Sequence, residues 1–137
     1  MILIDAGPLV ALFDPKDRLH HHCDSTFKAI QGPLITTVSV LTEAFHILGP
    51  GSVGAQRLRE LLLSGGMDVW FMDSRAVRRS FELMERYADH PMDLADASLI
   101  VAAEVLQTRR IFTVDHNDFF TYRIQRGHLY ESVEVIG

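Results

Sequence analysis

Two short apolar runs that each end in an aspartate limit the fold more than any other part of the sequence. Residues 1–4 lead into Asp5, and residues 110–114 lead into Asp115. Both runs show almost no polar alternation, which is typical of central strands in a parallel sheet that is covered on both faces. Ligands of open α/β sheets bind at the carboxyl ends of the strands, so we expect the two acids to face one crevice.

Three further runs rich in β-branched or aromatic residues predict strands at residues 33–37, 68–72 and 132–136. The last of them alternates apolar and polar residues, as an edge strand does. Residues 94–106 are apolar on nearly every side and predict a largely buried helix. This alternation of strands and helices indicates a doubly wound α/β fold. A surface helix is also predicted, with a buried stripe made of Val77, Phe81, Met84 and Ala88.

The length and composition of the chain set further limits. Its 137 residues are enough for one core, so we expect a single domain over residues 1–137. The lone Cys23, the absence of a signal-peptide pattern and the lack of an apolar run long enough to span a bilayer predict a cytoplasmic protein with no membrane contact. The formal charge of −5 neither supports nor excludes binding of RNA. Four of the 18 acids are interpreted below as metal ligands, and without them 14 acidic residues stand against 13 basic ones.

Two other acids lie in apolar sequence surroundings, where a charge is unfavourable unless it is paired or bound to an ion. Glu43 lies on a helix after the second predicted strand, and Asp96 lies in the first turn of the predicted buried helix. With Asp5 and Asp115 they would bring four carboxylates to one pocket. Such carboxylates repel one another unless a cation is present, and their hard oxygen atoms favour Mg²⁺ or Mn²⁺. The pattern indicates a metal site able to activate water against a phosphodiester bond.

The order and spacing of these acids resemble those of PIN-domain ribonucleases, and in particular the VapC-like toxins of type II toxin–antitoxin pairs. The resemblance runs nearly from one end of the chain to the other. The segments that carry it are Ile4-Asp5-Ala6-Gly7-Pro8-Leu9, Val40-Leu41-Thr42-Glu43, Asp93-Leu94-Ala95-Asp96-Ala97-Ser98-Leu99-Ile100 and Thr113-Val114-Asp115-His116-Asn117-Asp118-Phe119.

This resemblance implies a three-layer α/β/α fold with a central five-stranded parallel sheet of order 3-2-1-4-5. It implies an endoribonuclease dependent on Mg²⁺ or Mn²⁺, with an RNA substrate, an antitoxin whose peptide blocks the cleft, and a homodimer. The chain departs from the family at Ala6 and Gly7, where hydroxyl or amide side chains often follow the first Asp; this departure would alter metal affinity or activity. The implied catalytic metal ligands are Asp5, Glu43, Asp96 and Asp115.

Three residues close in sequence to the implied ligands are weaker candidates for the metal site. Thr113 lies two residues before Asp115, and its hydroxyl is expected to support the metal ligands from behind. Asp93 is expected mainly to cap the helix that begins at Leu94. Asp118 is interpreted either as a fifth acid at the rim of the site or as part of a solvated turn.

Two other groups of residues invite a functional interpretation. The run from His20 to Cys23 has zinc-ligand chemistry, but the remaining ligands of such a site are missing, so a structural helix is favoured. Arg109, Arg110 and Arg123 are the better candidates for phosphate contact. The remaining arginines between residues 75 and 86 alternate with glutamates, as on a solvated helix face.

Two alternative functions remain open on the sequence alone. Ala6 and Gly7 suggest a degenerate PIN domain that binds RNA or protein without cutting. A phosphoacceptor signalling module also holds Mg²⁺ at strand ends, but it needs paired acids after its first strand and a late lysine, whereas this chain has only Lys16 and Lys28. A haloacid-dehalogenase-type phosphatase is excluded, because Gly7 stands where its second acid is required.

Overall fold

Five parallel strands form the central sheet of the computed structural model, which describes residues 1–137. Their order is β3-β2-β1-β4-β7, so the predicted order 3-2-1-4-5 is confirmed, with β7 as the fifth strand. β1 and β4 lie in the interior of the sheet, as their apolar sequences predict, and β7 lies at an edge. The strands are β1 (Ile2–Ile4), β2 (Leu34–Thr37), β3 (Asp68–Trp70), β4 (Arg110–Phe112) and β7 (Glu134–Ile136).

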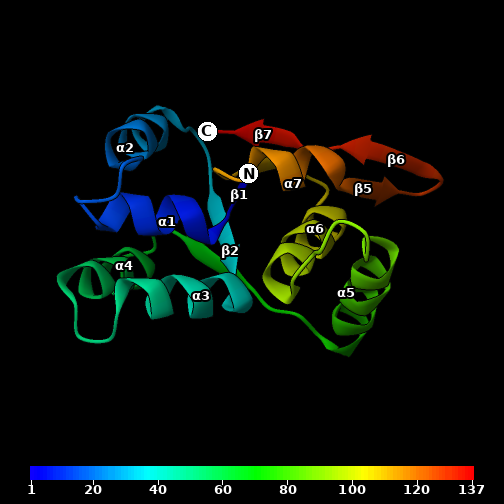
Figure 1. Ribbon diagram of the computed structural model, residues 1–137, viewed down its shortest axis with the longest axis horizontal. Coiled ribbons are helices and arrows are strands. Elements are labelled where there is room, and N and C mark those ends of the chain that lie inside the picture. Colours follow the sequence, from blue (N-terminus) through cyan, green and yellow to red (C-terminus); the bar gives the residue numbers. More distant parts are fainter.

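Helices cover both faces of the sheet and complete the expected three-layer α/β/α fold (Figure 1). In that view α1, α2 and α4 lie to the left of the sheet, and α5 and α6 lie to the right. None of the helices has the length and apolar character needed to cross a membrane. The helices are α1 (Ala6–Phe13), α2 (His20–Ala29), α3 (Val38–Leu48), α4 (Val53–Leu63), α5 (Ser74–Arg86), α6 (Leu94–Leu106) and α7 (His116–Thr121).

The core forms where α6 packs against β1 and β2. All residues of α6 between Ala97 and Ala103 are buried, so the prediction of a largely buried helix is confirmed. One polar contact lies inside this core: the hydroxyls of Ser98 and Thr37 are 2.7 Å apart. Because Thr37 ends β2 and caps α3, this contact fixes the start of α3 beside α6, at the carboxyl edge of the sheet.

The apolar stripe predicted for α5 is wrong. The buried residues of this helix are Ala76, Ser80 and Leu83, whereas Phe81 is 57% exposed. The helix packs on α6 with the face that carries these three residues, and it is therefore rotated away from the expected stripe. Val77 and Met84 are only half-buried, and Ala88 lies exposed beyond the end of the helix.

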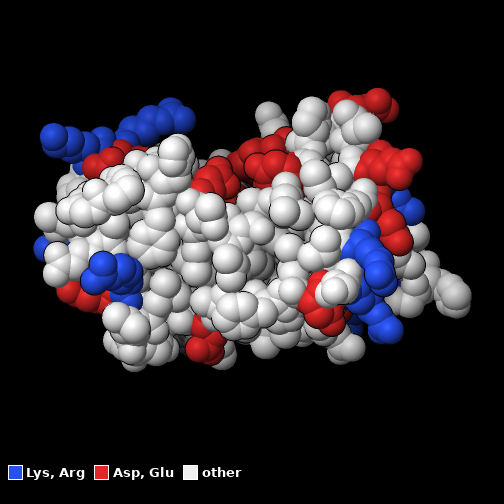
Figure 2. Space-filling view, turned by 90° about the horizontal axis from the view of Figure 1, so that it is seen from below, with Lys and Arg blue, Asp and Glu red and all other residues white.

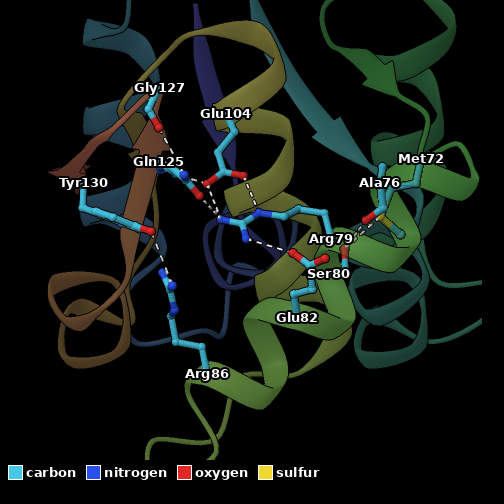
Figure 3. A network of polar contacts seen from close by, with 10 residues as sticks. All are labelled: Met72, Ala76, Arg79, Ser80, Glu82, Arg86, Glu104, Gln125, Gly127 and Tyr130. Carbon is cyan, nitrogen blue, oxygen red and sulfur yellow. Dashed lines mark hydrogen bonds and ion pairs between the residues drawn. The ribbon is translucent and has the colours of Figure 1, made fainter.

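A two-stranded hairpin made of β5 (Arg123–Arg126) and β6 (Leu129–Ser132) was not predicted. Its strands are largely polar, so they carry no apolar run that would mark them. A polar network holds the hairpin against α5 and α6 (Figure 3). Arg79 makes two hydrogen bonds to Glu104, of 2.9 and 3.0 Å, and one of 3.1 Å to Gln125. The backbone N–H of Gln125 donates to Glu104 at 2.8 Å, so one glutamate of α6 binds both neighbours.

Candidate active site

Asp5 lies at the base of the site because of the register between the two interior strands. Ile4 pairs with Phe112, and the N–H of Asp5 donates to the carbonyl of Phe112 at 2.9 Å. One carboxylate oxygen accepts the N–H of Ala6 at 2.8 Å, so Asp5 caps α1, and the other accepts the hydroxyl of Thr113 at 2.8 Å. The residue is only 8% exposed. Burial raises the pKa of Asp5 to about 6, against the opposing effect of these hydrogen bonds.

Thr113 links Asp5 to the segment that follows the carboxyl end of β4. Its hydroxyl donates to Asp5 and accepts the N–H of Asp115 at 3.0 Å. Asp115 is itself exposed and caps α7, where its carboxylate accepts the N–H of Asp118 at 3.1 Å. Partial loss of hydration raises the pKa of the Asp115 carboxyl, and the neighbouring Asp118 raises it further. One buried hydroxyl therefore sets the relative position of the two strand-end acids.

Asp96 and Asp93 form a capping box at the start of α6. Asp93 accepts the N–H of Asp96 at 2.8 Å, and Asp96 accepts the N–H of Asp93 at 3.3 Å. The prediction that Asp93 caps this helix is confirmed. Burial, followed by the charges of Asp93 and Asp5, raises the pKa of the half-buried Asp96 to about 8.

Glu43 lies at the rim of the site, and the expectation that it sits in apolar surroundings is wrong. The buried residues of α3 are Val40 and Ala44, and Glu43 projects beside them as an exposed side chain. Its pKa is still raised, by desolvation and by the charge of Asp93. Asp118 is half-buried and bonds to the ring of His90.

All these acids line one cavity of about 500 Å³. The structure thus brings the four predicted acids together with both doubtful neighbours, and no Lys, Arg or His lines the cavity. On the face of the molecule seen in Figure 2, acidic side chains gather at the middle of the upper margin, and Lys and Arg lie toward the two ends. The lining acids are Asp5, Glu43, Asp93, Asp96, Asp115 and Asp118.

The chemistry of these donors fits a hard divalent cation. All six side chains offer only carboxylate oxygen, the ligand type that Mg²⁺ and Mn²⁺ prefer. The raised pKa values of Asp5 and Asp96 show that the pocket disfavours their negative charge, which a cation would offset. No three His, Cys, Asp or Glu side chains are close enough together to coordinate one metal ion in this structure. The acids instead lie spread over the walls of the cavity.

The structure does not place the other basic and zinc-type candidates at this site. Arg109 and Arg110 lie at the amino end of β4, away from the carboxyl edge, and bond to the end of the hairpin and to Glu134. Arg123 donates to three carbonyls at the end of α7. The expectation that these arginines contact phosphate rests on their closeness in sequence to the site, and the structure places Arg109 and Arg110 at the opposite end of β4 from the cavity. The run from His20 to Cys23 forms α2 without gathering metal ligands.

Gly7 has a structural role that the sequence did not reveal. A Cβ atom at this position would lie 2.6 Å from Cγ2 of Val114, which also lines the cavity. The first turn of α1 therefore approaches the end of β4 more closely than any larger residue would permit.

A doubly wound sheet with six acids lining one cavity at its carboxyl edge is typical of a class of α/β protein. The profile of the PIN domain family matches residues 2–123, so this chain belongs to that family. Among proteins of known function it is similar to ribonuclease VapC26 of Mycobacterium tuberculosis. The two are 25% identical over 126 residues, which cover 89% of this chain and 92% of that protein.

Solved structures show the same fold. VapC20 of Mycobacterium tuberculosis, described as a sarcin-ricin loop cleaving toxin, superposes with a TM-score of 0.79 at 18% identity, over 86% of this chain and 92% of that one. A chain of a toxin–antitoxin complex from Klebsiella pneumoniae gives a TM-score of 0.69 at 19% identity, over 88% and 92%. A chain of FitAB bound to a DNA fragment gives 0.61 at 18% identity, over 88% and 89%.

The raised pKa values predict how stability depends on pH. In the unfolded chain Asp5 and Asp96 have a pKa of 3.8, and folding raises these values to about 6 and about 8. Their contribution to stability is therefore complete below about pH 4 and is lost as pH rises through both folded values. With EDTA present, the melting temperature of the protein should fall by several degrees between about pH 5 and about pH 8.5.

The matched comparison for this pH series uses Asp96→Asn and Glu60→Gln, since Glu60 is an exposed acid on α4. Asp96→Asn should reduce the fall of the melting temperature with rising pH, and Glu60→Gln should leave this fall unchanged. A parallel fall in all three proteins would contradict the assignment of the effect to the cavity.

A second prediction concerns Gly7. Gly7→Ser should lower the free energy of unfolding by about 1–3 kcal/mol, because the new Cβ meets Val114 at 2.6 Å. Adding Val114→Ala should restore part of the loss by removing the opposing methyl, with Val114→Ala alone as the control. Urea denaturation measures all three. Equal stability of Gly7→Ser and the unaltered protein would rule out the close approach.

Proposed function

We propose that this protein is a metal-dependent endoribonuclease that hydrolyses phosphodiester bonds in RNA, and that it is the toxin of a type II toxin–antitoxin pair. One observation carries the proposal: six carboxylates line a single cavity at the carboxyl edge of a PIN fold, with no basic side chain among them. The similarity to a ribonuclease and to an RNA-cleaving toxin supports RNA as the substrate.

Asp5, Glu43, Asp96 and Asp115 are the residues that would hold Mg²⁺ or Mn²⁺. A bound ion of this kind supplies a water of lowered pKa and neutralises charge on the scissile phosphate. Asp5 is held by two hydrogen bonds, so its carboxylate cannot turn away from the cavity. Thr113 keeps Asp5 and Asp115 in register, while Glu43 contributes an exposed side chain from α3.

The rim acids have a different part in this proposal. Asp93 and Asp118 also line the cavity; Asp93 caps α6, and Asp118 bonds to the ring of His90. We assign both to shaping the electrostatic field around the ion rather than to binding it directly. This charge density repels RNA phosphates until a cation is bound, which makes metal uptake a condition for substrate binding.

The partners proposed here are a cognate antitoxin and a second copy of the chain. Two structures with the same fold come from complexes, one described as a toxin–antitoxin complex and one as FitAB bound to DNA. An antitoxin peptide bearing Arg or Lys would match the negative cavity and block it. Exposed apolar side chains on α3 and α4, including Ile47, Val53 and Leu63, offer surface of the kind that protein partners bury.

The proposal predicts cleavage of RNA by the purified protein with Mg²⁺ or Mn²⁺ and none with EDTA. Loss of groups behind a metal site typically costs 10–100-fold, so Asp5→Asn, which alters a ligand itself, should reduce cleavage by roughly 100-fold or more. Glu60→Gln is the control, since this exposed acid lies outside the cavity. Circular dichroism verifies that each variant is folded.

The competing possibility is a PIN domain that binds RNA or protein without cutting, which the apolar residues Ala6 and Gly7 favour. It predicts no cleavage under any metal condition and equal behaviour of the unaltered protein and Asp5→Asn. That pair of results would overturn the proposed enzyme. Stoichiometric metal uptake together with metal-dependent cleavage would exclude the alternative.

A further inference from the structure

Tyr122 is a fully buried polar residue that the proposed chemistry does not use. It ends α7 directly before β5 and is 0% exposed. Its ring packs edge-on against Tyr87 and Phe119, with centroids 5.1 and 5.3 Å away, and against His90 at 6.1 Å. A phenylalanine would satisfy this packing equally well. The buried hydroxyl therefore needs an explanation of its own.

That hydroxyl lies next to the proposed metal ligand on α6. It is 3.3 Å from Oδ2 of Asp96 and 3.4 Å from the carbonyl oxygen of Pro91. A phenol has one proton to donate, and a carboxylate is a stronger acceptor than a carbonyl, so the bond to Asp96 is favoured.

The two oxygens of Asp96 are used differently as a result. Oδ2 accepts both the N–H of Asp93 and the hydroxyl of Tyr122. No protein group donates to Oδ1, although Asp96 lines the cavity. Two donors on one oxygen hold the carboxylate plane and leave the other oxygen free for a ligand. Hydrogen bonds of this kind orient the carboxylates of metal sites.

We infer that Tyr122 is a positioning residue that holds Asp96 so that its free oxygen faces the divalent cation. This inference rests on the proposed metal site and adds a residue to it. The role is orientation through Asp96, since the hydroxyl of Tyr122 bonds to Asp96 and Pro91 and does not itself line the cavity.

The polar network of Figure 3 attaches the chain segment after Tyr122 to α6 at a second position. Glu104 lies on α6 two turns beyond Asp96, and it accepts the N–H of Gln125, three residues after Tyr122. Arg79 bonds to both Glu104 and Gln125. The segment from residue 122 to 125 is thus attached to α6 at both of its ends. This attachment keeps the hydroxyl of Tyr122 in place over Asp96.

The test compares Tyr122→Phe with Tyr87→Phe by calorimetric titration with Mn²⁺. Each variant loses one hydroxyl from the same ring cluster, but the hydroxyl of Tyr87 accepts the N–H of Arg123 and touches no carboxylate. Tyr122→Phe should weaken Mn²⁺ binding about 10-fold, in the range typical for groups behind a metal ligand. Tyr87→Phe should bind Mn²⁺ as the unaltered protein does, even if both variants melt at a lower temperature.

A second background shows whether Tyr122 acts through Asp96. In a chain that already carries Asp96→Asn, adding Tyr122→Phe should cause no further loss of Mn²⁺ affinity. A further loss of about 10-fold there would overturn the inference, as would equal Mn²⁺ affinity of Tyr122→Phe and the unaltered protein. Failure of the unaltered protein to bind Mn²⁺ would instead remove the proposed metal site, and the inference with it.

Discussion

Repulsion among six carboxylates that share one cavity is the constraint on which the rest of this structure depends. Asp5 is nearly inaccessible to solvent, and burial raises its pKa to about 6. The fold offsets part of this charge with helix N-termini: Asp5 caps α1, Asp93 caps α6 and Asp115 caps α7. Each cap places a carboxylate against free backbone N–H groups at the positive end of a helix. A bound cation of the proposed kind would offset the remaining repulsion.

Polar side chains around the cavity bond to the acids and fix their positions. Thr113 bonds to Asp5 and to the backbone of Asp115, Tyr122 bonds to Asp96, and His90 bonds to Asp118. These groups come from the residue after β4, from the end of α7 and from the loop before α6. Elements distant in sequence therefore each fix one acid, and the site depends on the complete fold rather than on any single motif.

Much of this arrangement could be predicted from the sequence, because buried strands leave a strong pattern. The apolar runs before Asp5 and Asp115 gave both the interior strands and the edge at which the acids meet. The β5–β6 hairpin could not be predicted in this way, since its stability comes from contacts between Gln125, Glu104 and Arg79 that are distant in sequence. The orientation of α5 could not be predicted either, because the face that it buries, with Ala76, Ser80 and Leu83, is not the apolar stripe of its sequence.

Some details of the site could not be predicted from the sequence either, because they depend on how distant segments pack together. The exposure of Glu43 depends on which side of α3 meets the core, and the role of Gly7 depends on the close approach of Val114. Tyr122 follows no recognisable pattern, because a single tyrosine at a helix end has many possible surroundings. Such residues become interpretable only when the distances between chain segments are known.

The central claim is that a divalent cation binds among the carboxylates at the carboxyl edge of the sheet. Anomalous diffraction from crystals grown with Mn²⁺ tests it most directly. We predict a manganese peak in the cavity within about 2.0–2.3 Å of carboxylate oxygens from Asp5, Asp96 and Asp115. A cavity without such a peak at saturating Mn²⁺, or a peak bound only elsewhere on the surface, would contradict the account.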